Sequence, residues 1–470
     1  MIRTGGEPAD PSRLRARTTA LGSEEPTAAL RRAADAGHLF AGPTLTMAAT
    51  GVVATLPLAG GLGPGPGRAG SGLGWVAEWL AEVGRAGDDG GPGTGPVAMG
   101  ALDFEPGAPA ELVVPRRVLT RDPAGSWWLT VMWGPHEDPD PGEGGDPDLG
   151  RRGGHEPPEA AEPPSSVGDP GWRDRVAALR AVPAPQEYRD AVADAVRRIA
   201  DRGLDKVVLG RRLDLELAGP IAVAAALERL RGREPACTTF SYPVAGGRFL
   251  GASPELLVSR RGGSARCHPL AGTVALTGDP EGDRAAVARL RASGKDRGEH
   301  AVVVRAIVEA LRASGGVVPE PGPPEIVRLR SVAHLATEVV ARYRDAARAP
   351  DALELLAALH PTPAVGGFPT EVALQAIRQL EAAPRRSWAG PVGWVDHVGN
   401  GDWVIGIRSA TVRGRRAWLW AGAGVVAESD PASELAETTV KLLPVADALL
   451  PGVDLEFLGR SEYRGSLPGV

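Results

Sequence analysis

The chain has 470 residues, of which 43% are hydrophobic, and a formal net charge of −6. This length allows two or three average domains or one large catalytic unit, and the apolar fraction suffices for a sizeable core. The acidic balance argues against a general nucleic-acid-binding protein, because there is no surplus of basic residues to neutralise phosphates.

The predicted elements follow one another in a mixed order. An uncharged window, 41–67, is broken by Gly and Pro, so it predicts buried strand and turn and not a membrane span. Strand-like runs such as "PVAMGALDFEP" follow. Later segments predict, in chain order, a helix over 188–203, a long strand over 205–217, a helix over 220–232, strands through 237–268, a long helical stretch over 281–314, further strands and a final helix. Because strands come in neighbouring runs, we expect an α+β fold with largely antiparallel sheets and helices packed outside.

Composition divides the chain into five regions. Residues 1–37 are polar and predict a disordered extension, and 38–133 predict a first folded part. The stretch 134–171 is rich in Pro, Gly and acidic residues, which predicts a mobile insertion. A second, larger folded domain covers 175–447, and 448–470 form a C-terminal tail.

The cysteines and the N-terminus indicate a compartment. Cys237 and Cys267 allow at most one disulfide, and no CxxC motif or Cys/His cluster suggests zinc. The first residues carry mixed charges and lack the apolar segment of a signal peptide. We therefore expect a cytoplasmic protein that does not associate with membranes.

Two helical segments carry acidic residues at a spacing that places them on one face. Asp296 and Glu299 are three residues apart in "SGKDRGEH", as are Glu434 and Glu437 in "SDPASELAETTVK". Lys441 lies one turn further along the second helix. Each pair alone could be a solvated charged face, and Glu434 could simply favour a helix start. Together, in the absence of Cys or His clusters, they suit a hard cation such as Mg²⁺.

A further carboxylate stands at the start of an apolar strand. In "SPELLVSR", Glu255 follows Pro254 and precedes three apolar residues. Burial there would raise the pKa of the Glu255 carboxyl. The alternative is an ordinary turn residue pointing into water. Nearby, the glycine-containing stretches "PLAGT" and "AGAGVV" could bring backbone N–H groups close to an anion, whereas "AGAGVV" lacks the GxGxxG spacing of a dinucleotide site.

Many ordered motifs between about residues 180 and 445 carry a resemblance to a known family. They include "DKVVLGR", "FLGASPELLV", "HPLAGT", "SGKDRGEH", "HLAT", "LHPTPAVGGFP", "GPVGWVD", "DWVIGIRSA" and "AGAGVVAESDPASELAETTVK". The chain resembles the chorismate-utilising enzymes, and among them it is most similar to the isochorismate synthases. The resemblance implies an α+β catalytic unit of two related halves, with large antiparallel sheets and an active site between them.

The resemblance also implies roles for individual residues. Glu255 matches the general acid that protonates the departing C4 hydroxyl of chorismate, and Lys206 matches the general base that activates water for attack at C2, a role that requires a neutral amine. Glu299 and Glu437 match Mg²⁺ ligands, with Asp296 beside the first of them. The remaining matched positions are Glu434, next to the metal ligands, and the substrate-holding residues Thr273, His334, Arg408, Gly424 and Lys441.

Single residues separate the related activities. Anthranilate synthases carry Gln at the position of Lys206, and aminodeoxychorismate synthases of the lysine-nucleophile type carry Lys at the position of Ala271. Salicylate synthases, which go on to eliminate pyruvate, share both positions and remain the main alternative; a catalytically inactive chorismate-binding homologue is the second. Trp388 and Gly406 depart from the residues usual in the family. The resemblance implies a monomer that needs no glutamine amidotransferase subunit, and it leaves open whether the product enters menaquinone or siderophore synthesis.

Overall fold

The computed structural model describes most of the chain between residues 9 and 464. Most of the expected insertion at 134–171 lies outside the described residues. Those described are 9–58, 61–62, 73–135, 137, 175–201, 203–453 and 455–464.

Strands of the described residues form two large sheets and one small sheet. Pairing is antiparallel apart from the parallel pair β1 and β5. In order across the larger, fourteen-stranded sheet the strands are β25 (Glu462–Arg464), β10 (Val176–Val182), β11 (Lys206–Leu217), β24 (Arg416–Val425), β23 (Ser409–Arg413), β13 (Gly247–Ser253), β12 (Thr238–Val244), β2 (His38–Ala41), β3 (Thr46–Thr50), β8 (Arg117–Arg121), β9 (Trp127–Trp133), β1 (Arg15–Gly22) and β5 (Gly84–Gly87), with β20 (Gly367–Phe368) pairing with β11. The eight-stranded sheet runs β19 (Val339–Arg342), β15 (Ser264–His268), β14 (Leu256–Arg261), β22 (Gly401–Ile405), β21 (Pro391–Asp396), β6 (Val97–Ala101), β7 (Ala110–Val114) and β4 (Ala54–Leu58). The small sheet contains β16 (Leu270–Ala275), β18 (Val332–Ala336) and β17 (Glu325–Arg328).

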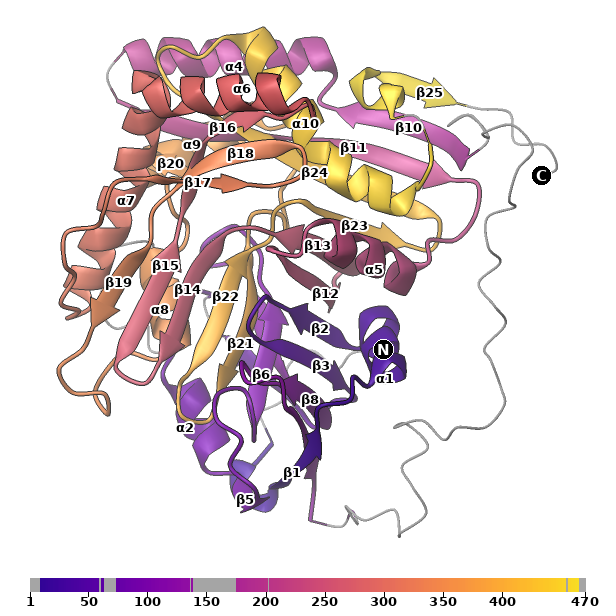
Figure 1. The fold of residues 1–470 in the computed structure, drawn as a ribbon, viewed down its shortest axis with the longest axis vertical. Coiled ribbons are helices and arrows are strands. Elements are labelled where there is room, and N and C mark those ends of the chain that lie inside the picture. The colour runs from indigo at the N-terminus through magenta and orange to yellow at the C-terminus, as the bar shows by residue number, and fades with distance from the viewer. Residues whose placement is uncertain are drawn as a thin grey trace.

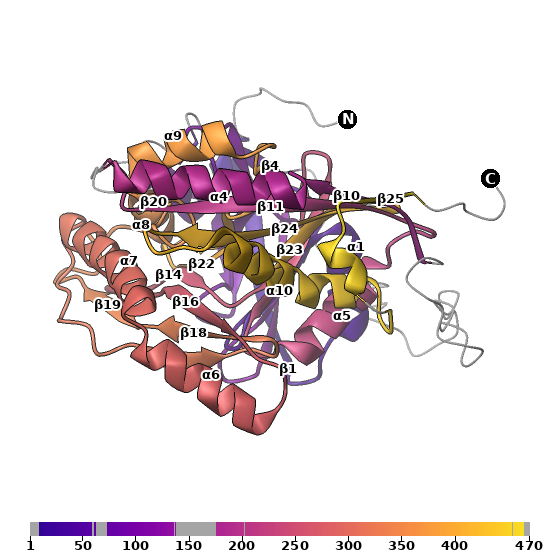
Figure 2. The ribbon, with the colours of Figure 1, turned by 90° about the horizontal axis from the view of Figure 1, so that it is seen from above.

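Helices lie outside these sheets, as the α+β prediction expected. In Figure 1, β10, β11 and β24 cross the upper part of the molecule, and β14, β21 and β22 descend below them. Figure 2 shows α4 and α9 side by side at the outside. The helices of the described residues are α1 (Thr27–Ala36), α2 (Trp75–Ala81), α4 (Pro185–Ala200), α5 (Val223–Arg233), α6 (Pro280–Ala292), α7 (Gly294–Ala313), α8 (Ala352–Leu359), α9 (Thr370–Leu380) and α10 (Pro431–Leu449), with short 3-10 turns at Pro11–Arg13 and Glu456–Gly459.

The two large sheets face each other across an apolar core. Phe40 and Phe249 of the fourteen-stranded sheet belong to one buried cluster with Met99 and Trp394 of the eight-stranded sheet. The hydroxyl of Tyr242 on β12 donates to the carbonyl of Gly393 on β21 at 3.1 Å, so a buried polar group also joins the sheets. Burial of each large side chain contributes on the order of 2 kcal/mol, and this core fixes one sheet relative to the other.

Two capped helix starts position the acidic pairs. The Ser293 hydroxyl accepts a hydrogen bond from the Asp296 N–H at 3.1 Å, and this cap begins α7. The single helical stretch expected over 281–314 is therefore two helices, α6 and α7, separated at Ser293. In α10 the Asp430 carboxylate caps the Ser433 N–H at 2.8 Å and Pro431 is the first helical residue, as the sequence indicates.

The N-terminal region differs from expectation. The prediction that 1–37 is a disordered extension is wrong for the described residues, because β1 pairs with β9 and β5 and α1 packs on β3. Ala16 and Thr18 on β1 are buried. Buried Ala16 and Thr18 alternate with exposed Arg15 and Arg17, so the average polarity of this strand concealed its half-buried first part.

The C-terminal tail is partly incorporated in the same way, because β25 pairs with β10. Among the described helices, none is long and apolar enough to cross a membrane. Cys237 and Cys267 are both buried and free, so the one possible disulfide does not form.

Candidate active site

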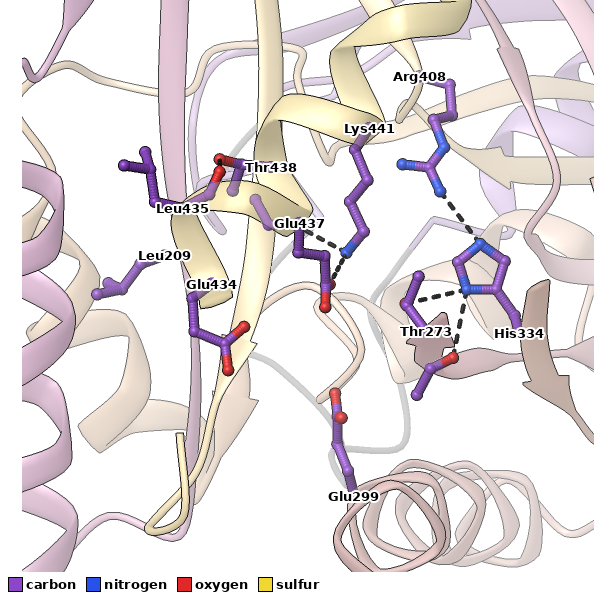
Figure 3. A network of polar contacts seen from close by, with 12 residues as sticks. Leu209, Thr273, Glu299, His334, Arg408, Glu434, Leu435, Glu437, Thr438 and Lys441 are labelled. Atoms are coloured by element: carbon purple, nitrogen blue, oxygen red, sulfur yellow. Dashed lines mark hydrogen bonds and ion pairs between the residues drawn. The ribbon is translucent and has the colours of Figure 1, made fainter. Parts of the chain in front are cut away.

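The predicted site residues converge on one pocket at the edge of β11 and β24. Every predicted site residue except Lys206 lines this pocket, and Lys206 contacts one of the lining carboxylates. Glu299 projects from α7 and Glu434 and Glu437 from α10 towards the same space, as Figure 3 shows. Residues far apart in the chain thus supply an acidic side, a basic side and a proton-carrying group.

Lys206 and Glu299 form the innermost ion pair. Lys206 Nζ lies 2.9 Å from Glu299 Oε1, and both side chains are buried, with exposed fractions of 2% and 11%. Burial alone would raise the pKa of the Glu299 carboxyl, but the charge and hydrogen bond of Lys206, with more distant lysines, lower it. Glu299 is therefore held as a carboxylate beside the Lys206 side chain.

A glycine leaves room for this pair. A Cβ on Gly424 of β24 would lie 2.5 Å from Glu299 Oε1 and 3.2 Å from the Lys206 Cε atom. Any larger residue would therefore displace the carboxylate. The role of Gly424 that the structure displays is steric: it lacks a side chain and so leaves room for the ion pair.

The acidic side of α10 is also paired with lysines. Glu437 Oε1 lies 2.5 Å from Lys441 Nζ, which donates a further hydrogen bond to the Gly422 carbonyl at 2.9 Å. Glu434 is nearly fully buried and lies 3.1 Å from Lys295 Nζ. Lysines thus neutralise carboxylates that would otherwise repel one another across the pocket.

Like charges nevertheless act between these groups. Burial raises the pKa of the Asp296 carboxyl, and the charges of Glu299 and Glu437 raise it further. The pKa of Glu434 is raised by burial and then by the charge of Glu437. The carboxylates of α7 and α10 are thus close enough to disfavour one another's ionised form, an arrangement that a bound cation would relieve.

Glu255 differs from the other acids. It is 4% exposed, and burial raises the pKa of its carboxyl to about 7, although the charges of Lys206, Lys441 and Arg408 oppose this shift. Its position before β14 is fixed because its N–H contacts the Ser253 hydroxyl at 3.3 Å and its carbonyl accepts from Ile405 N–H at 3.1 Å. A carboxyl group with this pKa carries a transferable proton near neutral pH, so the solvent-facing alternative is wrong.

The basic side of the pocket is a chain of three residues, drawn in Figure 3. Arg408 Nη2 lies 3.1 Å from His334 Nε2, and His334 Nδ1 lies 3.1 Å from the Thr273 hydroxyl and 3.3 Å from the Gly272 carbonyl. Arginine can only donate, so His334 Nε2 accepts and Nδ1 carries the proton. Burial, and then the Arg408 charge, hold the pKa of His334 well below its usual range, so the imidazole is neutral.

Arg408 is consequently a buried cation without an acidic partner. The guanidinium is 7% exposed and, among the described residues, makes no ion pair with a carboxylate. Its backbone has φ of 50°, a conformation costly for a non-glycine residue, and this conformation accompanies a side chain directed into the pocket. A buried, unpaired guanidinium is stable only if an anion joins it, which indicates a substrate carboxylate or similar group.

Several residues of the pocket were not singled out as site residues from the sequence. Lys295 lies directly before Asp296 in the charged motif, so its adjacency was the available signal. Trp420 of β24 gave no signal, because a tryptophan in a strand is ordinarily core. Ala364 and Val365 of the motif "HPTPAVGGFP" also line the pocket.

The unusual residues Trp388 and Gly406 have steric explanations. Trp388 lies over two facing glycines, and a Cβ on Gly210 or Gly422 would come within 2.5 or 2.8 Å of its ring. A Cβ on Gly406 would lie 2.7 Å from the Phe249 ring. Each large aromatic side chain thus occupies space that a glycine vacates, and Trp388 forms part of the pocket wall.

The carboxylates alone do not form a complete metal cage. Among the described residues, no three His, Cys, Asp or Glu side chains are grouped closely enough to hold a metal ion. A cation that uses two carboxylates and completes its shell with water and substrate oxygen atoms remains compatible with this donor set, and Mg²⁺ binds in this way. The like-charge effects on Asp296 and Glu434 agree with such a fit.

Comparisons with known proteins agree with the geometry. Isochorismate synthase DhbC of Bacillus subtilis (strain 168) is 40% identical over 283 residues, which cover 59% of this chain and 70% of that protein. The putative isochorismate synthase MenF of Mycobacterium tuberculosis (strain CDC 1551) is 36% identical over 370 residues, or 76% of this chain and 87% of the relative.

A solved structure is similar over most of its length. The crystal structure of the putative 2,3-dihydroxybenzoate-specific isochorismate synthase DhbC from Bacillus anthracis has a TM-score of 0.69 at 30% identity and covers 88% of this chain and 95% of its own. The family model described as "Chorismate binding enzyme" matches residues 45–450, which include the pocket and both acidic helices. The chain therefore belongs to the chorismate-binding enzyme family.

Proposed function

We propose that the chain is an isochorismate synthase, an isomerase that converts chorismate to isochorismate in the pocket between α7, α10 and β24. The observation that carries the proposal is the pairing of a protonatable buried acid, Glu255, with a buried lysine, Lys206, in one site. The activity named for the similar proteins supports it. Cytoplasmic location, a monomeric state and independence from an amidotransferase subunit belong to the same proposal.

The reaction needs one proton donated and one accepted. Glu255 gives its proton to the C4 hydroxyl, which leaves as water, and Lys206 takes a proton from the water that adds at C2 as the ring double bond shifts. One water enters and one leaves, so substrate and product are isomers. Because the acid is buried with its pKa at about 7, half of the molecules carry the required proton at neutral pH.

In this role Lys206 acts as a neutral amine, and its Nζ atom lies 2.9 Å from Glu299 Oε1. We propose that Mg²⁺ is held by Glu299 and Glu437, with Asp296 and Glu434 beside them. When bound, the ion would supply positive charge for a substrate carboxylate.

The basic side of the pocket orients the substrate. Arg408 supplies a fork of donors for a carboxylate, and Lys441 adds a second cation beside Gly422. Neutral His334 holds the guanidinium without neutralising it, and Thr273 fixes the imidazole. A dianion is thus bound by cations on one side and approached by the acid on the other.

The proposal predicts the product and the metal requirement. Incubation of the protein with chorismate and Mg²⁺ should yield isochorismate, separated by liquid chromatography, and chelation should abolish turnover reversibly. Salicylate with pyruvate would instead identify the salicylate synthase alternative. Full turnover after thorough chelation, or anthranilate formed with ammonia, would contradict the proposal.

Three substitutions separate chemistry from binding. Glu255→Gln and Lys206→Ala should each lower kcat by roughly 10²-fold or more, with KM for chorismate changed only a few-fold, because both residues transfer protons. Glu437→Gln should instead weaken Mg²⁺ and chorismate affinity together, read by titration calorimetry without turnover. Near-normal kcat in Glu255→Gln would remove the general acid from the account. A matched control is Glu428→Gln, on the exposed loop before α10, which should leave all three quantities unchanged.

The pH profile should show the Glu255 proton. A carboxyl pKa raised to about 7 means that the acid form predominates below that pH and is lost above it. The kcat/KM for chorismate should therefore fall about tenfold per unit as pH rises well above 7. In Glu255→Gln the residual rate should lack this limb. If the alkaline limb of the wild-type profile were also present in Glu255→Gln, the titrating group would be a residue other than Glu255.

A further inference from the structure

A second cavity lies beside the active-site pocket along the fourteen-stranded sheet. Strands β11, β23 and β24, the turn between β12 and β13, and the segment 384–387 line an open space of about 840 Å³. Trp420 lines both this cavity and the active-site pocket. Its position two residues before Gly422 on β24 places the two spaces side by side along one strand.

The lining of the second cavity is predominantly basic. It contains Arg212, Arg385, Arg386 and Arg413, against the single acid Asp103. Two of the arginines are neutralised elsewhere, because Arg212 pairs with Asp214 at 2.5 Å and Arg385 with Glu381 at 2.5 Å. Asp103 accepts a hydrogen bond from Ser387 at 3.0 Å.

Arg386 and Arg413 remain as unpaired charges. Among the described residues neither side chain forms an ion pair or hydrogen bond with another residue, and both are exposed at the cavity. Arg386 also has φ of 54°, while its carbonyl accepts the Phe104 N–H at 2.8 Å. A left-handed backbone is costly for an arginine, and the backbone contact with Phe104 holds Arg386 in it.

The wall between the two spaces is aromatic. Trp418 and Trp420 lie two residues apart on β24 and both face the cavity. The Trp420 ring is stacked on Trp388, with 5.1 Å between centroids and 13° between planes. The guanidinium of Arg212 also lies over the Trp420 ring, with its carbon 5.6 Å from the ring centroid. The Trp418 indole beside the cavity arginines favours a planar ligand that carries an acidic group.

We propose that this cavity binds a small aromatic carboxylate, with its ring against Trp418, next to the Trp420 stack, and its carboxylate between Arg386 and Arg413. This binding site is separate from the proposed isomerase activity. Its ligand differs from the substrate, which binds in the active-site pocket. Arg385 joins the two spaces, because it lines the cavity and its guanidinium carbon lies 4.8 Å from the Trp388 ring centroid.

Occupancy of the cavity would act on the active site through the tryptophan stack. Trp388 already lies closely over Gly210 and Gly422, which leaves it little room to move towards the sheet. A ligand that shifts Trp420 must therefore reorient Trp388 within the wall of the active-site pocket. The expected effect is a change in turnover that saturating chorismate does not reverse.

Binding of benzoate measured by calorimetry tests the site without turnover. Arg408→Ala serves as the background, because it removes the carboxylate-binding arginine of the active site. In that background benzoate should still bind, and adding Arg413→Ala or Arg386→Gly should weaken it about tenfold or more. Arg416→Ala, an exposed residue of the same hairpin that pairs with Glu216 and does not line the cavity, is the matched control and should leave affinity unchanged.

Two further ligands and one kinetic measurement complete the test. Cyclohexanecarboxylate and inorganic phosphate should bind at least several-fold more weakly than benzoate. Benzoate should lower wild-type kcat, and Arg413→Ala should keep normal turnover while losing this inhibition. Equal binding of all three anions, loss of benzoate binding in Arg408→Ala alone, or inhibition fully relieved by chorismate would each overturn the proposal. Because binding is read without catalysis, its failure leaves the isomerase proposal to its own assays.

Discussion

The ion pair between Lys206 and Glu299 is the interaction on which the site depends. It joins the first residue of β11, in the fourteen-stranded sheet, to the first turns of α7. Both side chains are largely inaccessible to water. Breaking such a pair by removing one partner leaves an uncompensated buried charge, so both ends are constrained. Gly424 must stay small to admit the pair, and Ser293 must cap α7 to place Glu299.

Environment gives chemically identical groups different tasks. Burial raises the pKa of Glu255 to about 7, whereas the lysines around Glu299 overcome the same burial and keep it ionised. The first carboxyl can therefore carry a proton and the second can hold a cation. Neutral His334 completes this division, because it supports Arg408 without cancelling the charge that a substrate carboxylate requires.

The sequence predicts the fold class and most of the site because these depend on local spacing and on a resemblance spread over many motifs. The i, i+3 acidic pairs and the Asp430 cap are local features and lie where the sequence indicates. The ordering of β1 was missed because it depends on pairing with β9, more than a hundred residues away. The Trp388 ring fits over Gly210 and Gly422 only because three separate segments meet in the fold. No local sequence pattern predicts this fit.

The central claim is that water adds at C2 while the C4 hydroxyl leaves with a proton from Glu255. Conversion of chorismate in ¹⁸O-labelled water, followed by mass spectrometry of the product, tests this claim most directly. The account predicts isochorismate that carries one ¹⁸O atom, in its C2 hydroxyl. Unlabelled isochorismate would show that the hydroxyl migrates within the substrate, and would contradict the roles of Glu255 and Lys206.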